Sequence, residues 1–187
     1  MKYNTKKITG IGLLSAIVAV LQVLSFTLAR AGVFSVTLAL IPIVVGSAVY
    51  DWRAGGWLGL VFGVTALLDA GPFFAVSIPA TIAVVLIKGI ACGVAAGLVY
   101  VLLRKCNDYV RVAAAAVVCP VVNTGVFLLG CRLFFYDALT RWGADYASFW
   151  AYAVFGLVGV NFLIELAVNA ILAPVVLRLI RVGKRGH

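Results

Sequence analysis

The sequence predicts an all-α membrane protein, a bundle of six transmembrane helices with both termini in the cytoplasm. Two observations carry this prediction. Of the 187 residues, 65% are hydrophobic and only 11% are charged, whereas a soluble domain carries about 25% charged residues. In addition, apolar runs near the roughly 20 residues needed to cross a bilayer recur along the whole chain. We therefore expect nearly all of the protein to lie in the membrane as one domain.

Six apolar segments are expected to span the bilayer, separated by turn-forming or charged residues. The first follows a basic start, as in a signal peptide, but it continues past Leu24 without a small-residue cleavage pattern, so we interpret it as a retained span. Pro42 falls inside the second segment, and Gly71-Pro72 ends the third. A longer loop with polar and aromatic residues precedes the sixth. The predicted spans are about residues 8–29, 33–50, 54–70, 79–103, 110–135 and 150–177.

The basic residues between the spans fall mostly on one side of the predicted bundle. Lys and Arg beside spans favour the cytoplasmic side, so both termini are expected there, and the net charge of +9 requires no nucleic-acid partner. The outer loops are aromatic, which fits either anchoring at the membrane interface or a lid over a ligand pocket. The predicted cytoplasmic residues are Lys2, Lys6, Lys7, Arg53, Arg104, Lys105, Arg111, Arg178, Arg181, Lys184 and Arg185.

Polar side chains interrupt three of the predicted spans. Asn161, Glu165 and Asn169 are four residues apart in the sixth, so they share one face of a helix. A carboxylate at bilayer depth costs several kcal/mol, and Glu165 should therefore face other helices or a cavity. Lys88 lies roughly 14 Å into the fourth span at about 1.5 Å per residue, and Asn123 lies near the middle of the fifth. We interpret Asn169, the deepest of its stripe, as structural.

Two interpretations of these residues stay open. In one, Lys88 and Glu165 form an ion pair, and the amides hold helices together by hydrogen bonds. In the other, spans four to six converge on a polar ligand cavity, where a cation meets an anionic or carbonyl group and Glu165 orients Lys88. The predicted substrate-binding residues are Lys88, Asn123, Arg132, Asn161 and Glu165.

The sequence lacks the motifs of several common catalytic and binding sites. The sequence has no GxxxxGK[ST] motif for ATP and no HExxH motif, and no serine combines a nucleophile context with a base. The single histidine, His187, is the last residue, and the four cysteines show no metal-site or disulfide spacing. We therefore expect no catalytic residues, no metal site and no cofactor bound by this chain.

Four stretches of the chain have a familiar pattern: KKITGIGLLSAIVAVL, TLALIPIVVGSAVYDWRAGGWLGLVFGV, CPVVNTGVFLLG and NFLIELAVNAILAP. They resemble the substrate-binding S components of energy-coupling factor (ECF) vitamin transporters. The resemblance covers essentially the whole chain and implies a plasma-membrane subunit that captures a vitamin or related micronutrient from outside. It also implies partners: a transmembrane coupling subunit and two cytoplasmic ATPases, which use the ATP. In that family the ligand sits in the outer half, among helices four to six.

The resemblance also implies a docking face on the first helix. Members of the family dock on the coupling subunit through an Ala-x-x-x-Ala pattern in this helix. Here Gly12-x-x-x-Ala16 and Ser15-x-x-x-Ala19 supply pairs of small residues, although Ala16-x-x-x-Val20 departs from the strict form. Small residues four apart let helices approach closely, which would serve packing inside this bundle equally well. The predicted partner interface is Gly12, Ser15, Ala16 and Ala19.

Other functions remain open at the level of sequence. The chain could be a stand-alone secondary carrier or channel, or a structural membrane partner, although it is small for a carrier and lacks paired broken helices in matching halves. The ligand is not named by the sequence. A basic residue with several amides suits a carboxylate vitamin such as pantothenate, and the aromatic outer loops suit a flat ring such as riboflavin.

Overall fold

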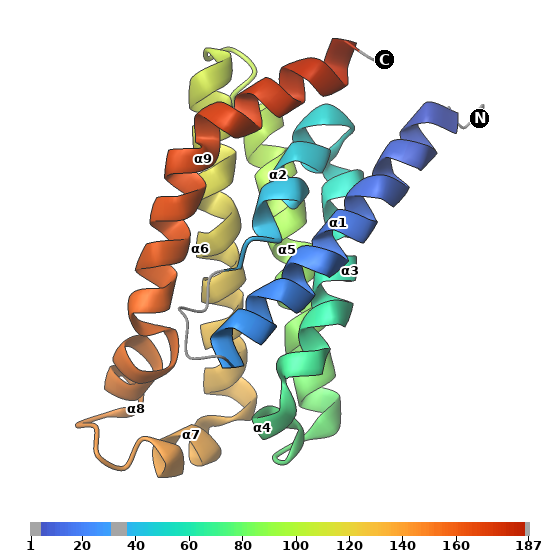
Figure 1. Ribbon diagram of the computed structural model, residues 1–187. Helices are drawn as coiled ribbons and strands as arrows, with labels where there is room; N and C mark the ends of the chain where they lie inside the picture. The colour runs from blue at the N-terminus through green and yellow to red at the C-terminus, as the bar shows by residue number, and fades with distance from the viewer. Residues whose placement is uncertain (1–4, 31–36, 186–187) are drawn as a thin grey trace.

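The computed structural model describes residues 5–30 and 37–185, apart from the side chains of residues 160 and 182–185, and the described part is helical (Figure 1). Residues 33–36 of the predicted second span, Lys2 and His187 lie outside the described ranges. The elements are α1 (Thr5–Arg30), α2 (Leu40–Val49), α3 (Trp52–Ala66), η1 (Leu67–Asp69), α4 (Gly71–Phe74), α5 (Ile78–Leu102), α6 (Asp108–Phe134), α7 (Tyr136–Trp142), α8 (Phe149–Ala151), η2 (Tyr152–Val158) and α9 (Gly159–Arg185).

Four helices of the described chain are long and apolar enough to cross a membrane: α1, α5, α6 and the Asn161–Arg181 part of α9. The described helices within the predicted second and third spans are shorter than these four. α2 has 10 residues and α3 has 15, or about 15 and 22 Å at 1.5 Å per residue. Pro42 lies in the first turn of α2, where its missing N–H breaks no helical hydrogen bond.

The predicted sixth span, residues 150–177, is not one regular helix. The Ser148 hydroxyl caps the short α8 by accepting from the Ala151 N–H at 3.2 Å, and the π-helical η2 follows. Gly159, at the start of α9, has a φ of 44°, a conformation that glycine adopts without the steric cost of a Cβ. α9 then continues to Arg185.

Glycines bring α3 and α5 into backbone contact. A Cβ on Gly59 would collide with the carbonyl oxygen of Gly89, and one on Gly89 would collide with that of Gly59. Gly55 and Gly93 are related in the same way. Each pair lies one helical turn from the next, so the two helices meet along a continuous glycine face. Close packing of this kind holds membrane helices together where lipid removes the hydrophobic drive.

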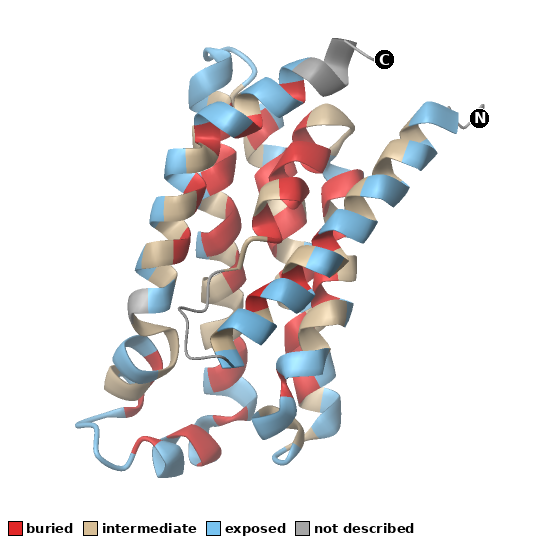
Figure 2. Ribbon diagram, viewed as in Figure 1, coloured by how far each residue is buried: buried red, intermediate tan, exposed pale blue. Residues whose placement is uncertain are grey.

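Both ends of the described chain lie at one end of the bundle, and α4 and α7 lie at the other (Figure 1). α1 crosses the outside of the bundle against α2 and α3, and most of its surface is exposed (Figure 2). The main buried cluster joins residues of α1, α2, α3, α5, α6 and α9, while a smaller one lies toward α7 and α8. The polar residues of α5, α6 and α9 are thus brought to one interior.

Candidate functional site

Two adjoining cavities lie between the helices, with volumes of about 280 and 180 Å³. Both are lined by Thr37, Lys88, Asn123, Phe127 and Leu157. The larger is further lined by Gln22, Phe62, Ala66, Asp69, Ala70, Phe73, Thr81, Val84, Val85 and Phe135. The smaller is further lined by Thr124, Val158, Asn161, Phe162 and Glu165. An apolar, aromatic pocket with a few polar groups is the usual composition of a small-ligand site.

Lys88 is the cation of this site. Its Nζ lies 4.8 Å from the centre of the Phe127 ring and 5.9 Å from that of Phe62, distances at which an ammonium is attracted to the ring face. No carboxylate of the described residues lies within 4.0 Å of Lys88. Lys88 and Glu165 line the same smaller cavity and do not form the direct ion pair that one interpretation of the sequence expected.

Within the described part of the chain, three buried oxygens at the cavities have no hydrogen-bond partner: Oε1 of Gln22, Oδ1 of Asn123 and Oε1 of Glu165. They come from α1, α6 and α9, and their side chains are 6–8% exposed. A buried polar atom without a partner costs about 1–3 kcal/mol. Three such atoms around the two adjoining cavities point to a ligand that supplies the missing donors.

The structure places the five predicted substrate-binding residues in two groups. Lys88, Asn123, Asn161 and Glu165 line the smaller cavity together. Arg132 lines neither cavity. It is exposed, with its guanidinium 4.2 Å from the centre of the Tyr136 ring and 5.8 Å from that of Phe149.

Asn169 takes no part in the cavities. Its side chain is buried and donates to the backbone carbonyl of Glu165 at 2.8 Å. The polar stripe of α9 therefore divides, since Asn161 and Glu165 face the cavity and Asn169 stabilises the helix.

The sequence prediction omitted several lining residues. Gln22 and Thr37 were visible as polar residues in apolar segments, and Thr37 lines the smaller cavity together with Glu165. Phe73 lies in one of the aromatic outer loops, for which the sequence left open interface anchoring or a lid over a ligand pocket, whereas Phe62 and Phe127, inside predicted spans, carried no such signal. Phe73 lies edge-to-face against Phe127 and Phe135, with ring centres 5.6 and 5.1 Å apart. Aromatic residues that face lipid look the same in sequence.

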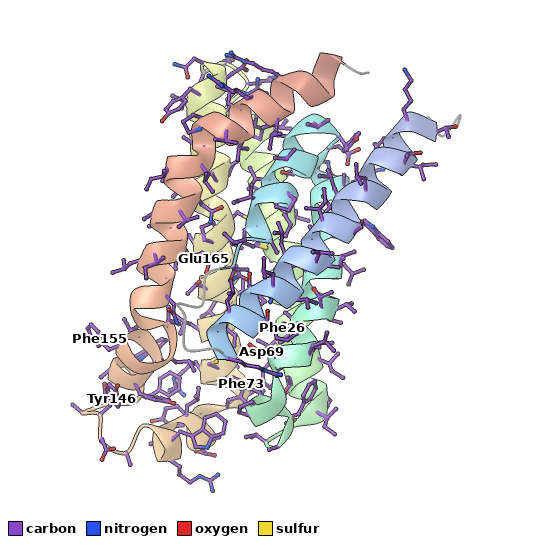
Figure 3. The ribbon with its side chains drawn as sticks, in the orientation of Figure 1. Phe26, Asp69, Phe73, Tyr146, Phe155 and Glu165 are labelled. Carbon is purple, nitrogen blue, oxygen red and sulfur yellow. The ribbon has the colours of Figure 1, made fainter. Side chains whose placement is uncertain are left out.

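The wall toward α4 and α7 is held by an ion pair. Arg30, at the end of α1, lies 3.6 Å from Asp69 and 5.2 Å from the centre of the Phe26 ring. Figure 3 shows Phe26, Asp69 and Phe73 nearer the α4 and α7 end, with Glu165 at mid-height in the bundle. The cavity therefore runs from this end toward the middle of the bundle.

The four small residues of the predicted partner interface lie on α1. Gly12 and Ala16 are exposed, and Ser15 and Ala19 are half-buried. A Cβ added to Gly12 would meet no atom within 4 Å. The Gly12–Ala16 edge is therefore free of packing against the described bundle. In the described ranges, no group of three or more His, Cys, Asp or Glu side chains could hold a metal ion.

Comparison with known proteins gives one match, and it covers most of the chain. Residues 6–177 match the family model described as "ECF transporter, substrate-specific component". The chain belongs to this family. No curated protein and no solved structure matches it.

Membership explains the composition and the cavity together. This S component is a multi-pass plasma-membrane protein and the substrate-binding subunit of an ECF transporter. Members of the family are transport subunits, not enzymes, and they associate with ECF transmembrane and ATPase subunits.

Proposed function

We propose that this S component captures a water-soluble vitamin or related micronutrient from outside in the cavity around Lys88. It would deliver the ligand inward together with a transmembrane coupling subunit and two cytoplasmic ATPases, which hydrolyse the ATP. The observation that carries the proposal comes from the described residues: three unpartnered oxygens line the cavities, and Lys88 has no carboxylate of these residues in ion-pair reach. A ligand would satisfy all four groups at once.

The orientation of the bundle supports capture from outside. The start of α1, with Lys6 and Lys7, and the end of α9, with Arg178 and Arg181, lie at the end opposite α4 and α7 (Figure 1), and the positive-inside rule would put that end in the cytoplasm. The cavity wall containing Asp69 and Phe73 would then lie toward the outer surface, where a solute arrives.

The binding test uses the purified chain and a panel of water-soluble vitamins, with calorimetry and native mass spectrometry as readouts. We expect one panel compound to bind to the S component alone. Lys88→Met, which keeps the length of the side chain and removes its charge, should weaken that binding by about tenfold or more, since hydrogen bonds to charged groups contribute about 1.5–3 kcal/mol. Lys105→Met, at an exposed position, is the matched control. A wild-type protein that binds nothing in the panel contradicts the proposal.

Partner assembly has its own test. Ala16→Leu should abolish co-purification with the coupling subunit and leave ligand affinity unchanged, because Ala16 is exposed on α1 and lines neither cavity. Ala170→Leu, an exposed alanine on α9, controls for added bulk facing lipid. Ligand flux into liposomes that hold only this chain, without ATP or partners, would instead identify a stand-alone carrier.

A further inference from the structure

We infer that the cavity selects an uncharged, donor-rich ligand over a carboxylate or phosphate. The inference rests on the proposed function and narrows its ligand class. The sequence left an anionic group and a carbonyl group open as the partner of Lys88, and the inference selects the carbonyl group.

The first step is the charge balance of the cavities. Among the described residues that line them, the charged side chains are Lys88, Asp69 and Glu165. Asp69 is paired with Arg30 at 3.6 Å. Lys88 and Glu165 remain, both lining the smaller cavity. The fixed charges around the ligand space therefore already sum to zero.

The second step is the cost of adding an anion. A ligand carboxylate beside Lys88 would share the smaller cavity with the buried Glu165 carboxylate. An uncompensated charge in a low-dielectric site costs several kcal/mol, and like charges placed together are a common way for a site to reject a ligand. Lys88 is also already in contact with the faces of Phe62 and Phe127. An uncharged ligand avoids this repulsion.

The third step is hydrogen-bond complementarity. An ammonium only donates, and a carboxylate only accepts. The ligand must therefore present an acceptor, such as a carbonyl oxygen, to Lys88 and a donor, such as N–H or O–H, to Oε1 of Glu165. The unpartnered oxygens of Gln22 and Asn123 call for further donors. The aromatic wall around Phe73 suits the apolar part of such a molecule.

Matched pairs of compounds that differ in charge test the inference. The probes are pantothenol with pantothenate, nicotinamide with nicotinate, and riboflavin with its 5′-phosphate, measured on the wild-type chain at pH 7.5. In the pair that binds, the uncharged member should bind about tenfold or more tightly than the anion, a difference of about 1.4 kcal/mol. This wild-type comparison needs no variant to fold.

A variant then assigns the discrimination to Glu165. Glu165→Gln removes the negative charge and keeps the shape, so it should narrow or reverse the ratio within the pair. Asp137→Asn, exposed on α7, should leave the ratio unchanged. An unchanged ratio in Glu165→Gln overturns the role of Glu165 and with it the inference.

The remaining outcomes separate the inference from the proposed function. A carboxylate or phosphate as the tightest-binding compound of the vitamin panel overturns the inference and leaves the proposed function standing. Binding of no compound at all removes both.

Discussion

The two sides of α5 differ in packing and in hydrogen bonding: one side is closely packed, and the other faces cavities with unpartnered polar atoms. Toward α3, Gly89 and Gly93 bring the backbones together, and there is no room for one methyl group. Toward α6 and α9, Lys88 faces two cavities whose oxygens lack partners. One helix thus carries a complete interface and an incomplete one. The complete side holds the bundle, and the incomplete side is available to a ligand.

This difference predicts which substitutions should alter stability and which should alter ligand affinity. Substitutions at the glycine face should change the stability of the bundle and leave binding untouched unless the protein unfolds. Substitutions at the cavity should change ligand affinity, and the free protein should tolerate them well. Stability and ligand affinity, measured on the same variants, therefore test whether the glycine face and the cavity side of α5 have these separate roles.

The largest effect is expected at Gly59. Gly59→Ala places a methyl group against the Gly89 carbonyl oxygen, and overpacking of this kind costs about 1–3 kcal/mol. Thermal unfolding in detergent should show a clearly lower Tm. Gly125→Ala is the control, because a Cβ at Gly125 meets nothing within 4 Å. Equal Tm values for the two variants would show that α3 and α5 are not in backbone contact.

The next effect separates two buried asparagines. Asn123→Ala removes an unpartnered cavity amide, so ligand affinity should fall by roughly five- to thirtyfold, the worth of a hydrogen bond of about 1–2 kcal/mol, while the Tm of the free protein stays the same. Asn169→Ala should do the reverse, because Asn169 bonds to its own helix. Calorimetry and thermal unfolding on both variants check this. The same pattern in both would place the two residues in one role.

A smaller effect on stability is expected from the ion pair between Lys7 and Asp51, at the end of the bundle opposite α4 and α7. Lys7 Nζ lies 2.6 Å from Asp51, whose other oxygen accepts from the Ala54 N–H at 2.7 Å. Partial burial raises the pKa of Asp51, but the Lys7 hydrogen bond, the Ala54 N–H and the Lys7 charge outweigh it, so the pKa lies below its ordinary value of 3.8. Lys7→Ala should cost about 0.2–1 kcal/mol at neutral pH, as exposed pairs do.

The pH dependence of this pair has a fixed sign. A carboxyl whose pKa is lowered by folding stabilises the protein fully above its ordinary pKa and loses that contribution as pH falls through the native value. The difference in Tm between wild type and Lys7→Ala should therefore shrink as pH is lowered from 6 to 3. Lys105→Ala is the control, and a Tm difference that stays constant would contradict the role of Asp51.

The smallest effect is expected at Arg132. Arg132→Ala should change ligand affinity by less than about threefold, because Arg132 lines neither cavity and packs over Tyr136 and Phe149. The variant also loses the cation–π contact, and such a contact at an exposed site is worth only about 0.5–1 kcal/mol, so the Tm should also change little. A loss of affinity as large as that of Asn123→Ala would mean that the ligand reaches beyond the cavities.

Much of the site could be predicted because a polar residue in an apolar span has few inexpensive positions. That rule found Lys88, Asn123 and Glu165. Applied to Arg132, near the end of its span, the rule has little force, since a long side chain there can reach the interface. Spacing was the better guide: Arg132 is nine residues after Asn123, about 180° around a regular helix at 3.6 residues per turn.

The helix lengths were harder to predict than the helices themselves. Apolar runs identify a span but do not show where the backbone leaves the helix. In the segment with α2, Thr37 lies outside the helix and lines both cavities. In the sixth segment, the departure depends on the φ of Gly159, and glycines inside apolar runs serve equally well for helix packing. The aromatic wall depends on three-dimensional neighbours that no local pattern records.

The π-helical segment η2 determines in which direction the side chains of the following helix, α9, point. Ala153, in η2, is fully buried, and so is most of Glu165. The two are twelve residues apart, which in an uninterrupted α-helix would set them about 120° apart around the axis. The irregular turn and Gly159 absorb this offset, so that both side chains face inward. The segment therefore fixes the rotation of α9 about its own axis. Deletion of a single residue from it would turn Asn161 and Glu165 away from the cavity, although neither residue would itself be changed.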